Sequence, residues 1–472
     1  MRFCTSTLGC KVNQYETQAI EDTLISRGHE RAETGEACDV CIVNTCAITN
    51  ESVRKSRQAI RRMKKSMPDT LIAVCGCLSQ LDPETAVTLG ADLIGGSGGR
   101  YDFALEIENC FNEAMVNQTP TMSGFPNDSA DELIGVEGQR AFSCNDIKGA
   151  KIVLDDPVQR FIFEDMQARA LSGRDPGRFP AAAKRTRALL KIQDGCDNHC
   201  SYCVIPLARG PVRSLPAERV IQHARRIGEQ GFREIVITGI EISSYGKDLA
   251  DKPSLTDAIR SVSSAAPGAR LRLGSLDPAA VTWDFCRELS YIRGLCDHFH
   301  LSLQSGCDDT LRRMGRKYDT NAAAAAAAML RSRFPGCGLT ADLITGFPGE
   351  TDAEFEHTLA FIKSVFFSDM HIFPFSPRPG THAAVMPGQI EKNVRRERAR
   401  LAGDAAGTMA YEFRTGMIGK TTDVLFERER GGYWTGHSGS YVEITAKNGG
   451  SKNNVHAVRI TGVEDDLVWG EL

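Results

Sequence analysis

The sequence predicts an α/β protein of three parts, and three patterns along its 472 residues indicate this. Strand-like and helix-like segments alternate near the amino terminus and again, six times over, in the centre, as parallel sheets require. The tail instead carries short alternating strands with glycines, at Thr422–Phe426, Tyr441–Thr445 and Val455–Ile460, which is typical of a small antiparallel β-barrel. We therefore expect domains at residues 1–125, 185–405 and 406–472, with a linker at 126–184.

Composition limits the class of protein. A hydrophobic content of 42% is ample for globular domains, and no segment approaches the ~18 apolar residues of a membrane span. The amino terminus lacks the apolar run of a signal peptide, so we expect a cytoplasmic protein with no membrane partner. Sixteen cysteines in such a protein favour metal ligands and free thiols over disulfides. The net charge of −4 does not indicate nucleic-acid binding, and no DNA partner is expected.

The first part of the chain begins with strand and helix signals in alternation. Met1–Thr7 alternates as a strand, and Asn13 is a suitable N-cap for a helix that runs to Ser26. Asp39–Val43 and Leu71–Val74 are two further apolar strands, each followed by a helix-like segment. Such units build a parallel sheet in which the carboxyl ends of the strands meet at one edge.

Three cysteines follow these strands at the points where the strands end, namely Cys10, Cys46 and Cys77. Because those ends meet at one edge, we expect the three thiols to converge. Three converging thiolates suggest a 4Fe-4S cluster that leaves one iron open. The alternative is that they are small buried hydrophobic side chains, as cysteines often are. Their recurrence at equivalent strand ends favours the cluster.

The central part repeats a strand followed by a helix six times. This number fits an open, partial (βα)6 barrel of parallel strands better than a closed eightfold barrel. Loops at the carboxyl ends of such strands form one mouth, where binding groups gather. The expected strands are Arg187–Ile192, Glu234–Thr238, Arg270–Gly274, His298–Leu303, Leu339–Ile344 and Met370–Phe375.

The loop after the first of these strands contains Cys196, Cys200 and Cys203 with the spacing C-x3-C-x2-C. Three thiolates at this spacing can hold three irons of a 4Fe-4S cluster and leave the fourth for another ligand. The alternatives are a zinc site or scattered buried thiols. Zinc sites usually combine pairs of two-residue-spaced ligands and close at four, so the cluster is favoured.

The same loop, with Tyr202 just before the last cysteine, resembles the radical S-adenosylmethionine (radical SAM) superfamily, in which SAM chelates the fourth iron. Polar groups at the later strand ends are suited to SAM, although each could instead belong to a turn or a helix cap. Their recurrence favours a shared ligand. The candidate SAM contacts are Tyr202, Gly239, Glu241, Ser275, Asp277 and Gln304.

A combination of motifs resembles the radical SAM methylthiotransferase family over nearly the whole chain. The resemblance implies an amino-terminal methylthiotransferase domain, a radical SAM barrel and a tail similar to a TRAM domain. Its motifs are Thr7–Glu16 (TLGCKVNQYE), Asn44–Cys46, Gly76–Cys77, the three-cysteine loop with Arg209–Gly210, and Phe373–Thr381 (FPFSPRPGT).

Lys11-Val12-Asn13 is similar to the family branch that acts on tRNA N6-threonylcarbamoyladenosine. The resemblance then implies an enzyme that adds a methylthio group to carbon 2 of this base at position 37, next to the anticodon. It implies two 4Fe-4S clusters, SAM, a tRNA substrate and an electron donor such as a flavodoxin or ferredoxin. No side chain is expected to act as a catalytic acid, base or nucleophile, because the cofactors perform the difficult step.

The basic segment Arg54–Lys65 contains seven cations and no acid. A run of this kind is more often a solvated helix face than a phosphate site. However, the expected helix that carries these cations comes directly after Cys46, which places them near the amino-terminal cysteines. We therefore expect some of them to contact the anticodon stem. The candidate RNA contacts are Arg54, Lys55, Arg61 and Arg62.

Two other functions compete with this interpretation. A methylthiotransferase acting on isopentenyladenosine tRNA or on a ribosomal protein would need the same clusters, but those branches carry other residues after the first cysteine. An iron-sulfur electron carrier would need no SAM groove, and the polar strand ends speak against it.

Overall fold

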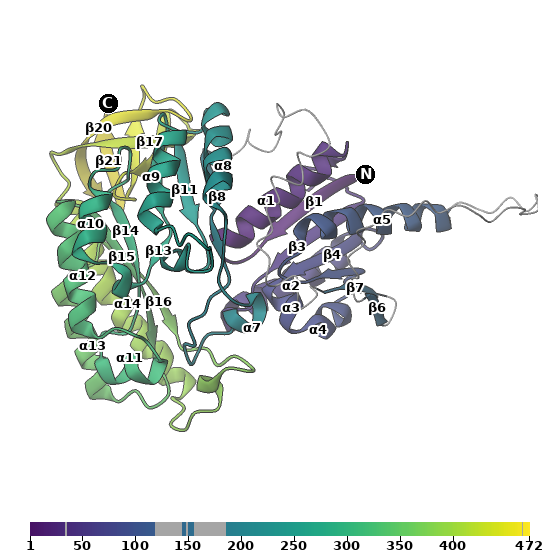
Figure 1. Ribbon diagram of the computed structural model, residues 1–472, viewed down its shortest axis with the longest axis horizontal. Coiled ribbons are helices and arrows are strands. Elements are labelled where there is room, and N and C mark those ends of the chain that lie inside the picture. Colours follow the sequence, from purple (N-terminus) through teal and green to yellow (C-terminus); the bar gives the residue numbers. More distant parts are fainter. Residues whose placement is uncertain (34, 119–143, 148–149, 155–185, 465) are drawn as a thin grey trace, which may run out of the picture. The chain divides into compact units, whose positions relative to one another are not determined.

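The computed structural model describes residues 1–33, 35–118, 144–147, 150–154, 186–464 and 466–472 (Figure 1). The chain forms two compact units. Unit 1 contains the amino-terminal residues together with Leu207–Arg209, and unit 2 contains the rest of the chain from residue 182 onward. No helix in the described ranges is long and apolar enough to cross a membrane.

Unit 1 is built on a seven-stranded sheet of order β2-β1-β3-β4-β5-β7-β6. All neighbouring strands are parallel except β6 and β7. Its strands are β1 (Arg2–Thr7), β2 (Glu30–Arg31), β3 (Val40–Thr45), β4 (Leu71–Gly76), β5 (Leu93–Gly95), β6 (Cys144–Ile147) and β7 (Ala150–Val153).

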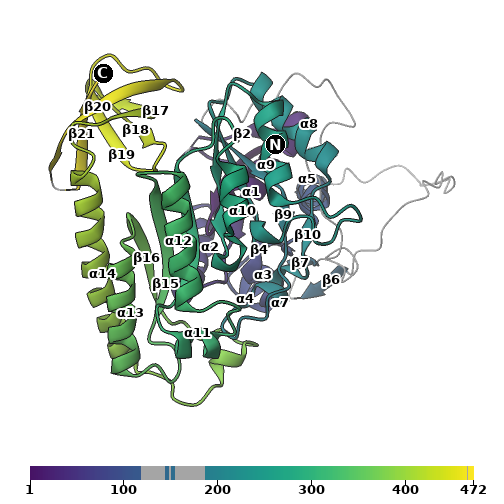
Figure 2. The same cartoon turned by 60° about the vertical axis from the view of Figure 1, so that its left-hand side comes forward.

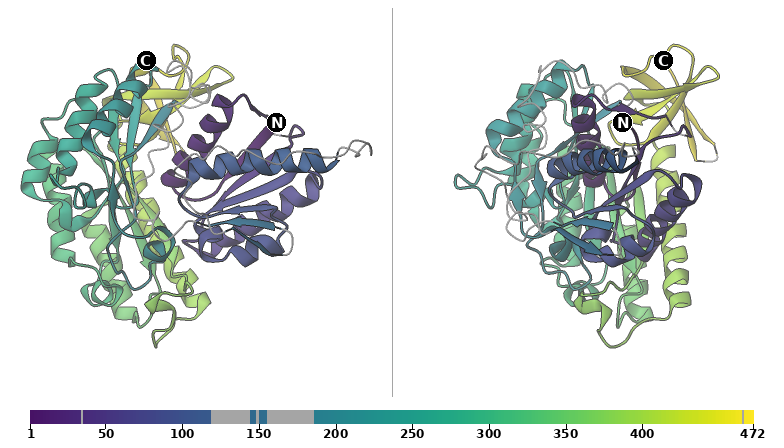
Figure 3. Two further views of the ribbon diagram at one scale, coloured as in Figure 1. Left: turned by 45° about the vertical axis from the view of Figure 1, so that its right-hand side comes forward. Right: turned by 90° about the vertical axis from the view of Figure 1, so that its right-hand side faces the viewer.

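Helices cover both faces of this sheet, as Figure 3 shows. Because side chains alternate along a strand, Ile42 packs with α1 and α5 on one face, whereas Val43 packs with α2 on the other. Strands buried on both faces are therefore nearly continuous apolar runs. The helices are α1 (Lys11–Ser26), α2 (Asn50–Ser66), α3 (Cys77–Leu81), α4 (Pro83–Thr88) and α5 (Arg100–Gln118).

Two expectations for unit 1 need correction. Helix α1 begins at Lys11 with Cys10 as its N-cap residue, so Asn13 lies inside the helix and does not cap it. The expected linker 126–184 also contains β6 and β7, which extend the sheet because β7 pairs with β5. These strands are short and carry no long apolar run, so local pattern did not reveal them. The remaining part of that range lies outside the described residues, apart from residue 154.

In unit 2, the six expected strands are present and parallel, and they form an open partial barrel (Figure 1). The strands belong to two hydrogen-bonded sheets, of order β12-β11-β8 and β13-β14-β15-β16. The strands are β8 (Arg187–Lys191), β11 (Glu234–Thr238), β12 (Arg270–Leu273), β13 (Ser275–Leu276), β14 (His298–Gln304), β15 (Gly338–Thr345) and β16 (Asp369–Pro374), and a short pair β9 (Gln193–Asp194) and β10 (Arg213–Ser214) flanks the cysteine loop.

Helices connect successive strands of the barrel, which is the arrangement that parallel strands require. Several begin with a side-chain cap, including Ser254, Asp319 and Thr351. The helices are α7 (Ile205–Arg209), α8 (Ala217–Glu229), α9 (Leu255–Ala265), α10 (Trp283–Leu289), α11 (Asp308–Met314), α12 (Thr320–Arg333), α13 (Asp352–Val365) and α14 (Lys392–Thr415), with 3-10 turns η3 (Ile242–Ser244), η4 (Pro278–Ala280) and η5 (His382–Ala384).

The tail forms a closed five-stranded barrel of order β17-β18-β19-β21-β20. It is antiparallel apart from the parallel pair β19 and β21, and β18 and β21 were not expected. Helix α14 runs across the expected boundary at 405/406 before the barrel starts (Figure 2). The strands are β17 (Thr421–Arg430), β18 (Tyr433–Ser438), β19 (Glu443–Lys447), β20 (Val455–Glu464) and β21 (Leu467–Glu471).

A buried charge cluster joins this tail to the central barrel within unit 2. Glu234 is fully buried and accepts hydrogen bonds from Arg270 Nε at 2.6 Å and Arg272 Nε at 2.8 Å. The same guanidinium groups donate to the backbone carbonyls of His437, Ser438 and Gly439 at 2.7 to 3.0 Å. Burial by itself raises the pKa of Glu234, but the charges of Arg272 and Arg270 outweigh it and lower the pKa to about 2.

Glu234→Gln is expected to destabilise unit 2 by about 3 kcal/mol near neutral pH, since it leaves two buried cations without their carboxylate. The pKa of Glu234 is depressed in the folded state, so its contribution is present above about pH 4.5 and is lost as the pH falls toward 2. Denaturant unfolding can be followed by the fluorescence of Trp283, Trp434 and Trp469, which all lie in unit 2.

The matched control is Glu397→Gln, which breaks an exposed pair with Arg400 and should leave the transition unchanged. Equal midpoints for the Glu234→Gln variant and the parent at pH 7 would contradict the assigned role of Glu234.

Candidate functional site

In unit 1, the three expected cysteines lie together at one edge of the sheet. Cys10 precedes α1, Cys46 follows β3, and Cys77 is the first residue of α3 after β4. Strands β1, β3 and β4 are neighbours, so the residues that follow them are adjacent. Cys46 and Cys77 are buried, whereas Cys10 is exposed as a whole residue although its thiol is surrounded by protein atoms.

Two glycines allow this close approach. Gly76 has φ +112°, and a Cβ atom there would lie 2.3 Å from the carbonyl oxygen of Thr45. Gly9 has φ +110°, and its Cβ atom would lie 2.9 Å from Cys46 Cβ and 3.1 Å from Cys46 Sγ. Any side chain at either position would push the cysteine-bearing turns apart, which gives the Gly-Cys pairs of the sequence a physical reason.

The electrostatics of the three thiols show that they share a small space. Burial raises the pKa of each one. Cys46 further raises the pKa of Cys10, Cys77 that of Cys46, and Cys10 that of Cys77. The guanidinium group of Arg209 lowers the pKa of all three. Thiols of this kind become thiolates when a metal replaces their protons.

In unit 2, Cys196, Cys200 and Cys203 lie on the loop between β9 and α7, beyond the carboxyl end of β8. Backbone hydrogen bonds hold the loop: Cys196 N donates to Gly210 O at 3.0 Å, and Cys203 N donates to Cys200 O at 3.0 Å. The preceding Gly195 has φ +68°, and a Cβ atom there would lie 1.7 Å from Pro211 O. The glycine is therefore required by the close return of the chain.

All three thiols of this loop are partly exposed. Burial raises the pKa of Cys196 to about 11 and that of Cys203 to about 12, and Cys200 contributes to both shifts. Each unit thus offers three neighbouring thiols, a donor set that fits a 4Fe-4S cluster with one iron left for an outside ligand. The thiols of each set thus act on one another electrostatically, and the assignment of each set to a cluster stays a prediction.

The candidate SAM contacts have mixed surroundings. Tyr202 packs edge-on against Phe347 with ring centroids 6.4 Å apart, and burial raises its pKa well above the usual value. It therefore forms part of an apolar wall. Gly239 lies where a Cβ atom would be 2.8 Å from Gln193 Oε1. Gln304 ends β14 in the left-handed region at φ +65°, a strained conformation found often at binding sites.

Glu241 and Asp277, two of the candidate SAM contacts, cap the 3-10 turns η3 and η4, which is the alternative role given for such residues in the sequence analysis. Glu241 accepts hydrogen bonds from Ser243 N at 3.0 Å and Ser244 Oγ at 2.5 Å. Asp277 accepts a hydrogen bond from Ala279 N at 2.9 Å. Asp277 directly follows β13, and Ser275 is the first residue of that strand. A cap bond uses one direction of a carboxylate, so these contacts are compatible with a further ligand.

Arg316 was missed as a site residue. Its side chain, 8% exposed, donates from Nη1 to Cys200 Sγ at 3.3 Å and from Nη2 to Asp277 at 2.9 Å. Its Nε lies 3.2 Å from Tyr318 OH. Arg316 belongs to a basic run, Leu311–Lys317, and nothing in that run distinguishes an inward-pointing arginine from solvated ones.

The cations of the basic helix α2 are of two kinds. Arg54 and Lys55 pair with Glu51 at 2.6 and 3.8 Å, which partly neutralises them. Arg61 and Arg62 are exposed and have no ion-pair partner among the residues that the structure describes. Of the four candidate RNA contacts, these two are the better placed to attract phosphate.

An open (βα)6 barrel with a C-x3-C-x2-C loop after its first strand defines a radical SAM enzyme. The family model described as the Radical SAM superfamily matches residues 190–362, and the model described as Uncharacterized protein family UPF0004 matches residues 2–95.

Curated relatives match almost the whole chain. The Threonylcarbamoyladenosine tRNA methylthiotransferase MtaB of Bacillus subtilis is 33% identical and covers 93% of this chain and 89% of its own. The protein of the same name from Thermotoga maritima is 32% identical and covers 98% and 95%. The chain therefore belongs to the radical SAM methylthiotransferase family, as its motifs predicted. Its cofactors are SAM and two 4Fe-4S clusters.

Two further similarities are more distant. The tRNA-2-methylthio-N(6)-dimethylallyladenosine synthase of Acetivibrio thermocellus is 28% identical and covers 90% of this chain and 80% of its own. A solved structure, the radical S-adenosylmethionine methyltransferase TsrM from Kitasatospora setae, has a TM-score of 0.55 at 14% identity and covers 81% of this chain and 77% of its own. The latter supports the fold alone.

Proposed function

We propose that the chain adds a methylthio group to carbon 2 of N6-threonylcarbamoyladenosine at position 37 of tRNA. The observation that carries the proposal is the set of relatives named for this activity, which are 29–33% identical over nearly the whole chain. Lys11-Val12-Asn13, directly after the first cysteine, supports the same branch.

The proposed ligands are Cys196, Cys200 and Cys203 for the radical SAM cluster and Cys10, Cys46 and Cys77 for the amino-terminal one. When bound by these residues, the former cluster and SAM would supply the radical chemistry needed to remove hydrogen from an unactivated adenine carbon. The latter set of thiols holds the group that provides sulfur. The two triplets of neighbouring thiols described above support these assignments.

The protein's own side chains bind and orient these groups. Arg316 places a positive charge beside Cys200 and fixes Asp277, so it couples the cluster loop to a candidate SAM contact. Glu241, Ser275 and Gln304 offer polar groups at neighbouring strand ends. Tyr202 and Phe347 pack edge-on and add an apolar surface beside the loop.

The test is nucleoside analysis after reaction with defined tRNAs. Anaerobically reconstituted enzyme is incubated with SAM, dithionite and tRNA that carries either threonylcarbamoyladenosine or isopentenyladenosine, and the digested nucleosides are weighed by mass spectrometry. A methylthio product from the first tRNA alone supports the proposal. Product from the isopentenyl tRNA alone would assign the chain to the activity named for the 28% identical relative.

Reduction of the clusters requires an electron donor, which we propose to be a flavodoxin or ferredoxin in the cytoplasm. The proposed tRNA substrate supports this setting, because tRNA is used by ribosomes in the cytoplasm. Dithionite replaces the donor in the test above, so the test does not depend on this part of the proposal.

Arg61→Gln/Arg62→Gln is expected to weaken tRNA binding and to reduce the slope of log affinity against log salt by about two, one for each phosphate that is no longer neutralised. Filter binding at several salt concentrations measures this. Arg260→Gln/Arg287→Gln removes two exposed arginines from α9 and α10 and serves as the control. An unchanged salt slope in the Arg61/Arg62 variant would rule out these phosphate contacts.

A further inference from the structure

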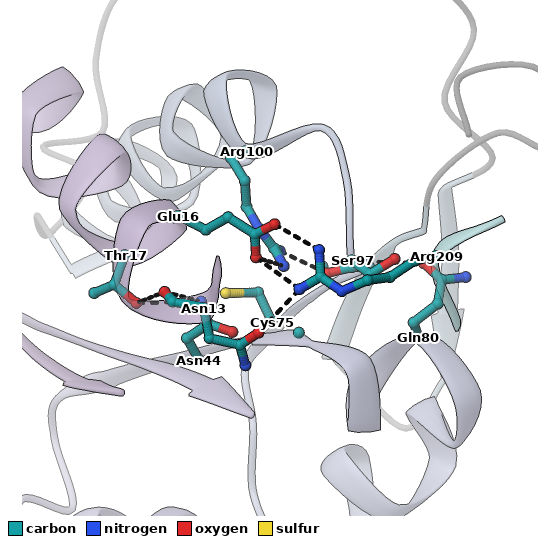
Figure 4. Close-up of polar contacts among 12 residues, drawn as sticks. Asn13, Glu16, Thr17, Asn44, Cys75, Gln80, Ser97, Arg100 and Arg209 are labelled. Atoms are coloured by element: carbon teal, nitrogen blue, oxygen red, sulfur yellow. Dashed lines mark hydrogen bonds and ion pairs between the residues drawn. The ribbon is translucent and has the colours of Figure 1, made fainter. Parts of the chain in front are cut away.

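A buried polar network lies beside the amino-terminal thiols, and Figure 4 shows it. Arg209 donates from Nη1 to Glu16 Oε1 at 2.7 Å and from Nη2 to Glu16 Oε2 at 3.1 Å. Arg100 donates to the same carboxylate at 3.2 Å. All three side chains are at most 2% exposed. Hydrogen bonds between ions are strong when their partners are shielded from water in this way.

The network reaches the first cysteine through Asn13. Arg209 Nη2 donates to Asn13 Oδ1 at 2.9 Å, while Asn13 Nδ2 donates to the carbonyl oxygens of Leu8 and Thr45 at 2.9 and 3.0 Å. Asn13 therefore ties the turn that carries Cys10 to the end of β3, and Arg209 orients Asn13. Inside the first turn of α1, the side-chain amide of Asn13 thus serves contacts across the sheet edge.

Arg209 arrives from a distant part of the sequence. It lies six positions after Cys203, yet Leu207–Arg209 packs within unit 1. Ala208 is fully buried beside Cys77 and Leu78, and its carbonyl oxygen accepts a hydrogen bond from Ser97 Oγ at 2.5 Å. The amino-terminal site thus includes a side chain from the segment that follows the radical SAM motif.

We propose that Arg209 is a positioning residue of the amino-terminal cluster, which sets the cluster's reduction potential by holding one positive charge beside its three cysteines against the counter-charge of Glu16. The inference rests on the proposed function, in particular on the cluster at Cys10, Cys46 and Cys77. Charges and hydrogen bonds around the sulfur atoms tune the potentials of such clusters, and partners of metal ligands orient them.

The charge of Arg209 lies one side chain away from the first cysteine, because Asn13 Oδ1 accepts hydrogen bonds from Arg209 Nη2 at 2.9 Å and from Cys10 Sγ at 3.6 Å. Its guanidinium lowers the pKa of Cys10, Cys46 and Cys77 alike, although burial outweighs it in each case, and Glu16 acts in the opposite direction on Cys10 and Cys77. Reduction adds a negative charge to the cluster. Removal of the arginine charge should therefore disfavour the reduced state and lower the reduction potential, and removal of the glutamate charge should raise the potential. These two changes predict shifts of opposite sign.

The experiment uses the full chain with Cys196→Ala/Cys200→Ala/Cys203→Ala, so that only the amino-terminal cluster remains, and adds Arg209→Gln, Arg209→Lys or Glu16→Gln. Iron content and the midpoint potential are measured by anaerobic redox titration. We expect a lower potential in Arg209→Gln, a higher one in Glu16→Gln and a value near the parent's in Arg209→Lys. Arg398→Gln, which opens a buried pair with Glu350 in unit 2, is the control and should cause no shift.

Shifts of the same sign, or no shift, in Arg209→Gln and Glu16→Gln would overturn the inference. If the Arg209→Gln variant holds no iron, the Arg209→Lys variant decides the question. Iron retained in the lysine variant supports a role for the positive charge, and iron lost from both variants refutes it. If the parent triple variant itself holds no iron, the proposed amino-terminal cluster fails instead. The two failures are therefore distinguishable.

Discussion

Cys196→Ala/Cys200→Ala/Cys203→Ala is expected to lower the iron content of anaerobically reconstituted protein from about eight to about four per chain. SAM cleavage to 5'-deoxyadenosine and the methylthio product should both fall to the background of the assay, because these three thiols are the proposed ligands of the cluster that binds SAM. Iron and sulfide quantitation together with chromatography of the SAM products measures this.

The control for this change is Cys286→Ala/Cys337→Ala. Both cysteines are buried in unit 2 outside the loop, and burial raises the pKa of both thiols. Iron content in that variant should equal the parent's. A parent that holds about four irons and a loop variant that holds none would show that the amino-terminal cysteines bind no cluster.

The second large effect is expected from Cys10→Ala/Cys46→Ala/Cys77→Ala. Iron should again fall to about four per chain, but SAM cleavage should persist while methylthio transfer is lost. The reason is that the radical SAM loop and its partner Arg316 remain intact, and only the amino-terminal site that we propose to provide sulfur is removed. Product analysis of SAM and of the tRNA in the same reaction separates the two activities.

Cys41→Ala/Cys75→Ala is the matched control for unit 1, because both thiols are buried in strands of the same sheet and belong to its apolar packing. It should retain both clusters and form product. If the variant of the three site cysteines still forms methylthio product, the sulfur does not come from this site.

The cysteine sites were predictable because their information is local. Strand β11 has the bounds that its apolar run predicted, and β14 and β15 differ only at their ends. Cysteines placed just after such strands share an edge by the geometry of parallel sheets alone. In contrast, β18 and β21 were missed, because their stability depends on barrel partners far away in the sequence.

The partners of those cysteines were not predictable. Arg316 looks in the sequence like a surface cation, whereas Glu16 and Arg209 belong to the family motifs, which do not reveal that the two side chains pair with each other. Each is buried because an oppositely charged or polar group meets it from a remote segment: Asp277 for Arg316, and Glu16 with Asn13 for Arg209. Burial of a charge is decided by such partners, which local pattern does not reveal.

The sequence by itself therefore determined the class of protein, the three-part architecture and the two cysteine triplets, because strand periodicity, cysteine spacing and family motifs are all short-range features. Only the tertiary structure decided which charges surround each triplet, that Leu207–Arg209 returns to unit 1, and that Arg270 and Arg272 join the tail barrel to the central one. These features depend on contacts between residues far apart in the chain, and their energy comes from desolvated pairs that exist only once the chain has folded.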